Sequence, residues 1–436
     1  MRECRAIGRL RGRKVYPQNF DCFSAGFFFL VIWCAGVLVP LYPFLMGFDG
    51  FTAFWEFKYS DKESSLINAL VLYSFTLILV LIGTYVGRKT QIDLPSQTRF
   101  IVSPRIFLQR TAIFTLVAAS AFLVILFVIG GVSGLIQGAS DRIRAFAGLN
   151  GLFLLQNLLL SVSLAWYIRL TRSSESIFFE RCLFWGYFVG ALMICALQGQ
   201  KSTLFISLLS LIVVRHYRVK RINLARAALL GFVMFVSLMI YHVFKQEYLA
   251  TGKFFFIKKD EGVFISFLSF MATQFTGNLM QLQTMTVLID AMPERLPWQN
   301  GSTLLMIALI LVPSAFFPGK PLTAAGVFTT AFWPNKWLME GTTLPPGVFG
   351  EVYMNFGAVG VLLGGILLGI VWGRLYGAVM YNPQSDRALG TYALAVASML
   401  HLFRGEFSSV LLLVASIWLP FLLLSSRREP PAPNPV

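Results

Sequence analysis

The chain has 436 residues, of which 56% are hydrophobic and 13% are charged, and its mean hydropathy is +0.70. Soluble proteins carry about 25% charged residues, and several apolar runs here are long enough to cross a bilayer, so the composition excludes a soluble globular protein and predicts an all-α polytopic integral membrane protein. We attribute the formal net charge of +16 to basic residues on the cytoplasmic side of a membrane rather than to nucleic-acid binding.

The N-terminal segment, residues 1–23, is basic, and no clear small-residue cleavage site follows the first apolar run. We therefore expect a cytoplasmic tail and an uncleaved anchor. The predicted spans are 24–46, 64–86, 108–130, 151–168, 182–198, 202–215, 227–244, 350–373, 388–403 and 407–425. With the N-terminus inside, ten spans place both termini in the cytoplasm.

Basic residues divide unequally between the two sides of this topology. The inner segments hold about 23 of the 36 Lys and Arg residues, in agreement with the positive-inside rule. The predicted organisation is a bundle of about seven spans at 24–244, a long outer loop at 245–349, about three spans at 350–425, and a Pro-rich cytoplasmic tail at 426–436.

Two apolar stretches in the outer loop, "GVFISFLSFMATQFTGNLMQLQTMTVLI" and "STLLMIALILVPSAFF", leave the span count open between about ten and twelve. The first contains side-chain amides at Gln274, Asn278, Gln281 and Gln283. Such a polar side indicates an amphipathic helix that is interfacial or lines a cavity. Either both stretches within 262–318 cross the membrane or neither does, because one alone would reverse the final charge pattern; we expect neither to cross.

Cysteines and histidines indicate no metal site. The five cysteines are scattered without a CxxC pair, and the three histidines are dispersed. This spacing predicts neither a disulfide framework nor a zinc site, and we expect no cofactor.

Ionisable residues at membrane depth are functional candidates by default, and several collect at the predicted outer face. They are Arg142, Arg144, Lys201, His242, Lys245, Lys320, Glu351, His401, Arg404 and Glu406. Each has a structural alternative: Lys and Arg at helix ends extend to the interface, His401 can be a buried hydrogen-bonded histidine, and Glu406 can pair with Arg404. As a set, several cations held in short turns at one face predict a phosphate or diphosphate site.

The stretch "PPGVFGEVYMNFGAVG" places one acid, Glu351, in this cationic field. A carboxylate beside a diphosphate can accept a proton from a sugar hydroxyl. Tyr353 and Asn355 can hydrogen-bond within a polar cavity, or Tyr353 can anchor at the interface. The glycines that follow predict close helix packing.

Four segments resemble the bacterial oligosaccharide repeat-unit polymerases, the Wzy-type O-antigen and exopolysaccharide polymerases, which share a superfamily with the O-antigen ligases. They are "LPPGVFGEVYMNFGAVGVLLGGILLG", "NGSTLLMIALILVPSAFFPGKP", "GQKSTLFISLLSLI" and "HLFRGEF". Together they cover about 200 residues, mainly in the second half. The first half is similar only in its hydrophobic pattern.

The resemblance implies a GT-C-like helical membrane enzyme in the bacterial inner membrane. Such an enzyme would join polyprenyl-diphosphate-linked oligosaccharides at the periplasmic face without a metal, and membrane lipid and a chain-length regulator are further candidate partners. By position, Lys201, Arg404 and Lys320 would contact the diphosphate, with Arg144 as a further phosphate candidate. Glu351 would be a base or a substrate-orienting acid.

Further positions are assigned to the substrate as a group: Lys245, Tyr353, Asn355 and His401 would contact diphosphate or glycan. Lys201 stands where the resemblance leads us to expect Arg, and this keeps the charge but loses the bidentate fork.

Two other functions stay open. A ligase would share the diphosphate site and differ in its acceptor; ligases typically have a functional histidine in the long outer loop, and 245–349 contains none, although His242 and His401 lie near spans. A flippase or transporter of lipid-linked sugars would need a charged path through the middle of the membrane, whereas the candidates here cluster at one face.

Overall fold

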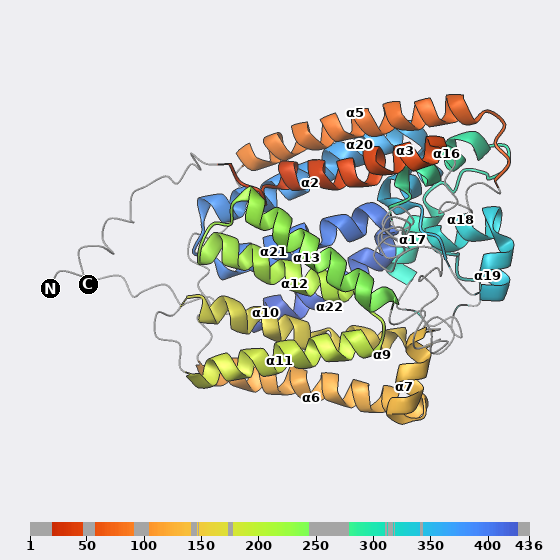
Figure 1. Cartoon of the computed structure of the whole chain (residues 1–436). Coiled ribbons are helices and arrows are strands. Elements are labelled where there is room, and N and C mark those ends of the chain that lie inside the picture. The colour runs from red at the N-terminus through yellow and green to blue at the C-terminus, as the bar shows by residue number, and fades with distance from the viewer. Residues whose placement is uncertain are drawn as a thin grey trace, which may run out of the picture.

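A computed structural model of the chain describes residues 20–46, 57–90, 104–140, 146, 148–172, 178–243, 279–309, 312, 317, 319–340 and 343–425. Their regular structure is helical, without a strand. The helices are α2 (Ala25–Trp33), the π-helix η1 (Cys34–Leu38), α3 (Val39–Met46), α5 (Lys62–Lys89), α6 (Pro104–Val128), α7 (Gly131–Ser140), α9 (Asn150–Gln156), α10 (Leu158–Leu170), α11 (Phe178–Leu197), α12 (Lys201–Arg218), α13 (Leu224–Val243), α16 (Gln281–Ala291), α17 (Ser302–Leu309), α18 (Ala324–Phe332), α19 (Pro334–Glu340), α20 (Gly347–Tyr381), α21 (Asp386–Arg404) and α22 (Phe407–Leu424). Figure 1 shows the long helices side by side, with α5 and α20 at one edge and α6 and α11 at the other.

Among the described residues, seven helices are long and apolar enough to cross a membrane. They are α5, α6, α9 together with α10, α11, α13, α20 and α22. The prediction of a helical polytopic membrane protein is therefore confirmed. α12 and α21 occupy two further predicted spans, and their more polar sequences are explained by their position, because much of each helix is buried inside the protein.

Side-chain caps begin several of the described helices. Asp61 accepts a hydrogen bond from the Ser64 amide at 3.0 Å at the start of α5, and Ser385 accepts one from the Ala388 amide at 3.2 Å at the start of α21. Such caps satisfy backbone donors that the first turn leaves unpaired. They determine where the membrane helices begin.

Three predicted spans are not single regular helices. The first contains the π-helical turn η1 between α2 and α3, and the fourth is divided into α9 and α10 at Asn157. In α20, Gly357 has φ 63° and ψ −159°, which breaks the helix two residues after Asn355. Glycine tolerates this positive φ because it has no Cβ.

The glycines of α20 pack directly against α5. Gly365 lies on Thr76 and Gly369 on Val80, and a Cβ at Gly369 would stand 2.3 Å from the Val80 carbonyl oxygen. From one contact to the next, the residue number increases in both helices, so α5 and α20 run parallel. The predicted role of the glycine ladder in close helix packing is confirmed at these positions.

The described part of the outer loop contains four short helices, α16 to α19. α16 has 11 residues and is about 16 Å long, which is too short to cross a bilayer. Gln281 and Gln283 are buried inside the protein, so the alternative of an interfacial helix is wrong for them. Gln274 and Asn278 lie outside the described residues.

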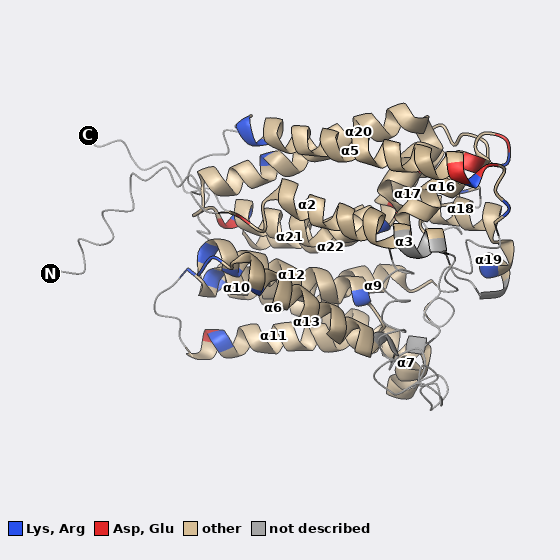
Figure 2. Cartoon of the chain, turned by 45° about the horizontal axis from the view of Figure 1, so that its top comes forward, with Lys and Arg blue, Asp and Glu red and all other residues tan. Residues whose placement is uncertain are grey.

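Basic residues gather at one end of the bundle, which we call the basic end (Figure 2). Of the 21 Lys and Arg residues in the described part, 14 belong to the helix ends and turns on this side: Arg88, Lys89, Arg105, Arg110, Arg169, Arg172, Arg181, Arg215, Arg218, Lys220, Arg221, Arg226, Arg374 and Arg387. Arg218 of α12 pairs with Asp386 of α21 at 2.8 Å. α12 and α21 are therefore antiparallel, and their other ends, at Lys201 and Arg404, meet at the opposite end of the bundle.

Candidate functional site: a cationic cavity between α12, α13 and α21

A tight turn between α11 and α12 places Lys201 at the opposite end. Gly199 has φ 70°, its amide donates to Ala196 O at 3.0 Å, and the Gln200 amide donates to Cys195 O at 2.9 Å. This is the Schellman pattern of helix termination, in which a left-handed residue, usually glycine, follows the last turn. Lys201 then begins α12 at once, so its side chain stays at the mouth of the bundle.

The end of α21 supplies two further polar side chains. His401 and Arg404 lie three positions apart in its last turn, and each is half-buried. Gly405 follows; a Cβ there would stand 2.8 Å from His401 O, so the chain can turn toward α22 this closely only with glycine. Arg404 makes no ion pair with any residue in the described part of the chain.

These residues surround one cavity of about 140 Å³. It is lined by Lys201, Ser202, Phe205, Phe235, Leu238, Met239, Leu279, Leu400, His401 and Arg404. The wall is mostly apolar and contains two cations but, among the described residues, no carboxylate. Because α12 also presents its N-terminus without a side-chain cap, the helix dipole adds to the positive potential. The arrangement suits an anionic group attached to an apolar chain.

Glu351 lies in the first half of α20 and is fully buried. Its Oε2 accepts a hydrogen bond from the backbone amide of Phe407 at 2.6 Å, and Phe407 is the first residue of α22. The carboxylate thus caps the N-terminus of α22, and α22 begins three residues after Arg404. Its Oε1 has no hydrogen-bond partner among the described residues, and Glu351 is not one of the residues that line the cavity.

Glu406 performs a similar function for another helix. Its Oε2 accepts a hydrogen bond from the Ala325 amide of α18 at 2.8 Å, and its Oε1 accepts one from Ser409. The alternative pairing of Glu406 with Arg404 is not formed. Two carboxylates therefore connect α20, α22 and α18 beside the cavity.

Asn355 joins α20 to the start of α17. Its Nδ2 donates to Thr303 Oγ1 and to Glu351 O, each at 2.7 Å, and its Oδ1 accepts from the Gly301 amide at 2.7 Å. Asn355 is buried, and these bonds are internal to the protein. Tyr353 is half-buried and packs against Trp298 with ring centroids 5.7 Å apart.

The remaining predicted residues do not line the cavity. Lys320 donates from Nζ to Val312 O at 3.0 Å. Arg144 and Lys245 lie outside the described residues, as does Arg142. The structure thus brings together Lys201, His401 and Arg404.

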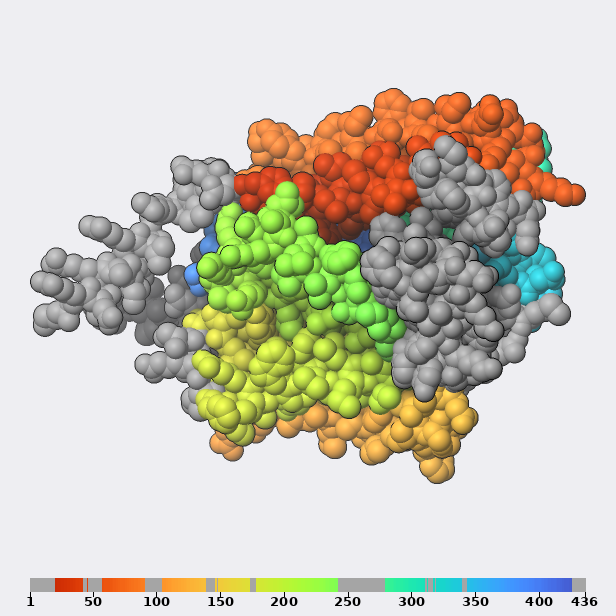
Figure 3. Space-filling view, in the orientation of Figure 1, coloured from red at the N-terminus to blue at the C-terminus, as the bar shows by residue number. Residues whose placement is uncertain are grey.

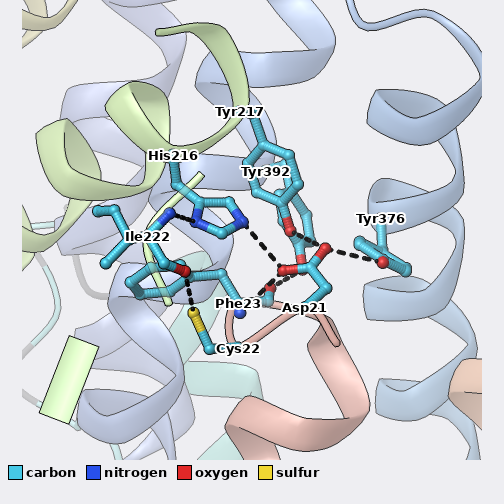
Figure 4. A network of polar contacts seen from close by, with 8 residues as sticks. All are labelled: Asp21, Cys22, Phe23, His216, Tyr217, Ile222, Tyr376 and Tyr392. Carbon is cyan, nitrogen blue, oxygen red and sulfur yellow. Dashed lines mark hydrogen bonds and ion pairs between the residues drawn. The ribbon is translucent and has the colours of Figure 1, made fainter. Parts of the chain in front are cut away.

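A buried network at the basic end was not predicted from the sequence (Figure 4). Asp21, just before α2, lies 3.2 Å from His216 Nε2 of α12. Its Oδ2 accepts hydrogen bonds from Tyr217 and Tyr376, each at 2.9 Å. The Tyr392 hydroxyl donates to Phe23 O at 2.5 Å. One carboxylate therefore holds the start of α2 against α12 and α20.

Asp21 is ionised in this setting. Burial opposes its ionisation, but the hydrogen bonds from His216 and from the two tyrosine hydroxyls outweigh burial and hold the pKa of Asp21 below its usual range. The signal in the sequence is a single acid directly before the first apolar run. An acid at the end of a basic tail suggests a salt bridge, but its partners lie about 200 and 350 positions away.

The chain was compared with known protein families, curated proteins and solved structures, and it matches none of them.

Proposed function

We propose that this protein joins polyprenyl-diphosphate-linked oligosaccharide repeat units at the periplasmic face of the bacterial inner membrane, as a metal-independent, GT-C-like glycosyltransferase. The product would be an O-antigen or exopolysaccharide chain. The observation that carries the proposal is the convergence of Lys201 and Arg404 on one cavity whose other walls are mostly apolar.

The proposed reaction replaces one bond at the sugar's anomeric carbon. A hydroxyl oxygen of the acceptor unit forms the glycosidic bond as the carbon–oxygen bond to the diphosphate breaks. The electron pair of the broken bond leaves with the polyprenyl diphosphate. Lys201 and Arg404 would stabilise the charge on this leaving group, because fixed cations in a partly dry pocket stabilise developing charge without reorganisation.

The hydroxyl proton also needs an acceptor. His401 lines the cavity with the two cations, and an imidazole nitrogen that carries no proton can accept one as the new bond forms. Glu351 would act differently: by holding the Phe407 amide, it fixes the turn that carries Arg404. We assign it a positioning role.

A ligase is the second candidate, because ligases typically have a functional histidine and His401 lines the cavity, whereas Glu351 does not. A ligase would use the same donor and the same cations but transfer the glycan to a different acceptor.

The experiment is a glycan ladder from cells that lack the gene, with and without complementation. Loss of the ladder with retention of single capped units supports the polymerase. Full-length polymer that accumulates on polyprenyl diphosphate supports the ligase. Loss of both, with lipid-linked units trapped on the cytoplasmic side, overturns the proposal in favour of a flippase.

Complementing variants test the site itself. Arg404→Ala should abolish chain extension, and Arg404→Lys should restore it only in part, because lysine keeps the charge but not the bidentate fork. Lys336→Ala is the matched control, since Lys336 lies on α19 at the same end of the bundle and does not line the cavity. Normal polymer from Arg404→Ala would show that the site is wrong.

A further inference from the structure

α13 packs more loosely than the other candidate spans. Only 11% of its most apolar stretch is buried, compared with 22% to 67% in the other six. Gly231, near its middle, has no neighbouring atom within 4 Å of a Cβ built there, as is also true of Gly186 and Gly190 in α11, whereas Gly369 and Gly373 of α20 meet the α5 backbone. The low buried share therefore distinguishes α13 from the other candidate spans.

The start of α13 is nevertheless fixed at the basic end (Figure 4). The Ile222 amide, two residues before α13, donates to His216 Nδ1 at 3.0 Å, and Cys22 Sγ donates to Ile222 O at 3.3 Å. His216 is itself held by Asp21. The buried network therefore anchors one end of α13.

The other half of α13 forms one wall of the cavity. Phe235, Leu238 and Met239 face the cavity, while Phe232 is 63% exposed on the outer side of the helix. Figure 3 shows α13 on the visible face of the molecule. Near its far end, the Tyr241 hydroxyl donates a hydrogen bond to Ala196 O of α11.

The cavity is too small for the ligand that its chemistry suits. Its volume is about 140 Å³, whereas pockets for ligands of ordinary size occupy about 300–1,000 Å³. The cavity as it stands holds only part of such a ligand, so we expect a wall to move when the hydrocarbon chain enters. Much of α12 and α21 is buried inside the protein, whereas only 11% of the most apolar stretch of α13 is buried, so α13 is the wall that can move with the least loss of packing.

We propose that α13 is a hinged wall: it turns about the anchored Ile222 and separates from α12 and α21 near Tyr241. Its opening admits, from the bilayer, the hydrocarbon chain of a lipid whose diphosphate head binds Lys201 and Arg404. The identity of this head group rests on the proposed function; the hinge rests on the packing of α13.

The test places a photo-crosslinking amino acid at Leu238 of the full-length protein in nanodiscs of phosphatidylglycerol and phosphatidylethanolamine. The probe is a long-chain polyprenyl diphosphate, and adducts are identified by mass spectrometry. The same amino acid at Phe232, on the lipid-facing side of α13, is the control. We expect a polyprenyl diphosphate adduct at Leu238 and none above the phospholipid background at Phe232.

A tether tests the movement. Tyr241→Cys and Ala196→Cys are introduced into a variant whose five native cysteines are replaced by serine, and a short bismaleimide that joins them holds α13 closed. Each single-cysteine protein in this background, treated with the same reagent, is the control. The tether should abolish the Leu238 adduct, and the controls should keep it. Tyr241→Phe, which removes only the hydroxyl, should increase the adduct, so the proposal stays testable if the double variant fails to fold.

Three results would overturn the hinge: an adduct that persists in the tethered protein, equal adducts at Leu238 and Phe232, or adducts with phospholipid alone in the presence of polyprenyl diphosphate. The assay measures binding and not polymerisation. The expected adducts together with a normal glycan ladder in the deletion strain would therefore refute the proposed function and leave the hinge intact.

Discussion

Glu351 shows how one buried side chain can have a role different from the chemistry that its residue type suggests. It is fully buried, and its carboxylate accepts a hydrogen bond from the first backbone amide of α22. A negative group at a helix N-terminus is stabilising, and loss of a cap costs about 0.5–2 kcal/mol. The residue therefore determines where the Arg404 turn lies.

We expect Glu351→Gln to keep most of the glycan ladder and most of the thermal stability, because the amide oxygen can still accept from Phe407. Glu351→Ala should lower both, since the cap is lost. The measurements are the ladder and the melting temperature of each purified variant. If Glu351→Gln melts normally but makes no polymer, Glu351 is a proton acceptor and not a positioning residue.

Asp21 makes stability depend on pH. Its pKa is lowered in the folded protein, so its contribution is fully present above the unfolded pKa of about 3.9 and is lost as the pH falls through the lower folded value. The difference in stability between the wild type and Asp21→Asn should thus be constant at neutral pH and decrease below about pH 4. Melting temperatures measured against pH check this; a difference that grows on acidification contradicts it.

Among pairs of helices, α5 and α20 make the closest backbone contact described above. Gly369→Ala would place a Cβ 2.3 Å from Val80 O, and overpacking typically costs about 1–3 kcal/mol. We expect a lower melting temperature and less folded protein in the membrane.

Gly186→Ala, in α11, is the control for this substitution. Nothing lies within 4 Å of its Cβ, and alanine is the better helix former by about 1 kcal/mol. Its stability should be unchanged or higher. Equal effects of the two variants would show that α5 and α20 do not approach as closely as described.

At the scale of the whole molecule, the uneven charge of its two ends predicts its orientation. The basic end should lie in the cytoplasm, and the cavity should face the periplasm. Lys220 and Asn335 are exposed at opposite ends. The two cysteines are introduced one at a time into a variant whose five native cysteines are replaced by serine. On spheroplasts, a membrane-impermeant maleimide should label Asn335→Cys directly and Lys220→Cys only after permeabilisation; the reverse pattern would place the cavity in the cytoplasm.

Much of the helix inventory could be predicted from the sequence. Each of the ten predicted spans coincides with helical structure, because a chain in hydrocarbon must satisfy its backbone groups within the segment. The breaks were not predicted. They are the π-turn at Cys34–Leu38 and the kink at Gly357. Both are changes in the local backbone geometry, and neither alters the hydrophobicity of the sequence, which is the property that predicts a span.

The candidate site was predicted in part. Lys201, His401 and Arg404 were selected because short turns hold charges at the bundle mouth, and the structure places all three on one cavity. Lys320 and Asn355 satisfy internal hydrogen bonds instead. The buried anchor at Asp21 was missed, because an acid at the end of a basic tail does not reveal partners so distant in the sequence.

The sequence by itself determined that this is a helical membrane protein with an uneven distribution of charge, since both properties depend on local composition. Only the tertiary structure decided that Lys201 and Arg404 share a cavity, that Glu351 caps α22 and that α13 packs loosely. The physical reason is that lipid is as apolar as the helix surfaces, so hydrophobicity does not select neighbouring helices. That selection depends on close-packed glycines and paired polar groups, and these act only between complete helices.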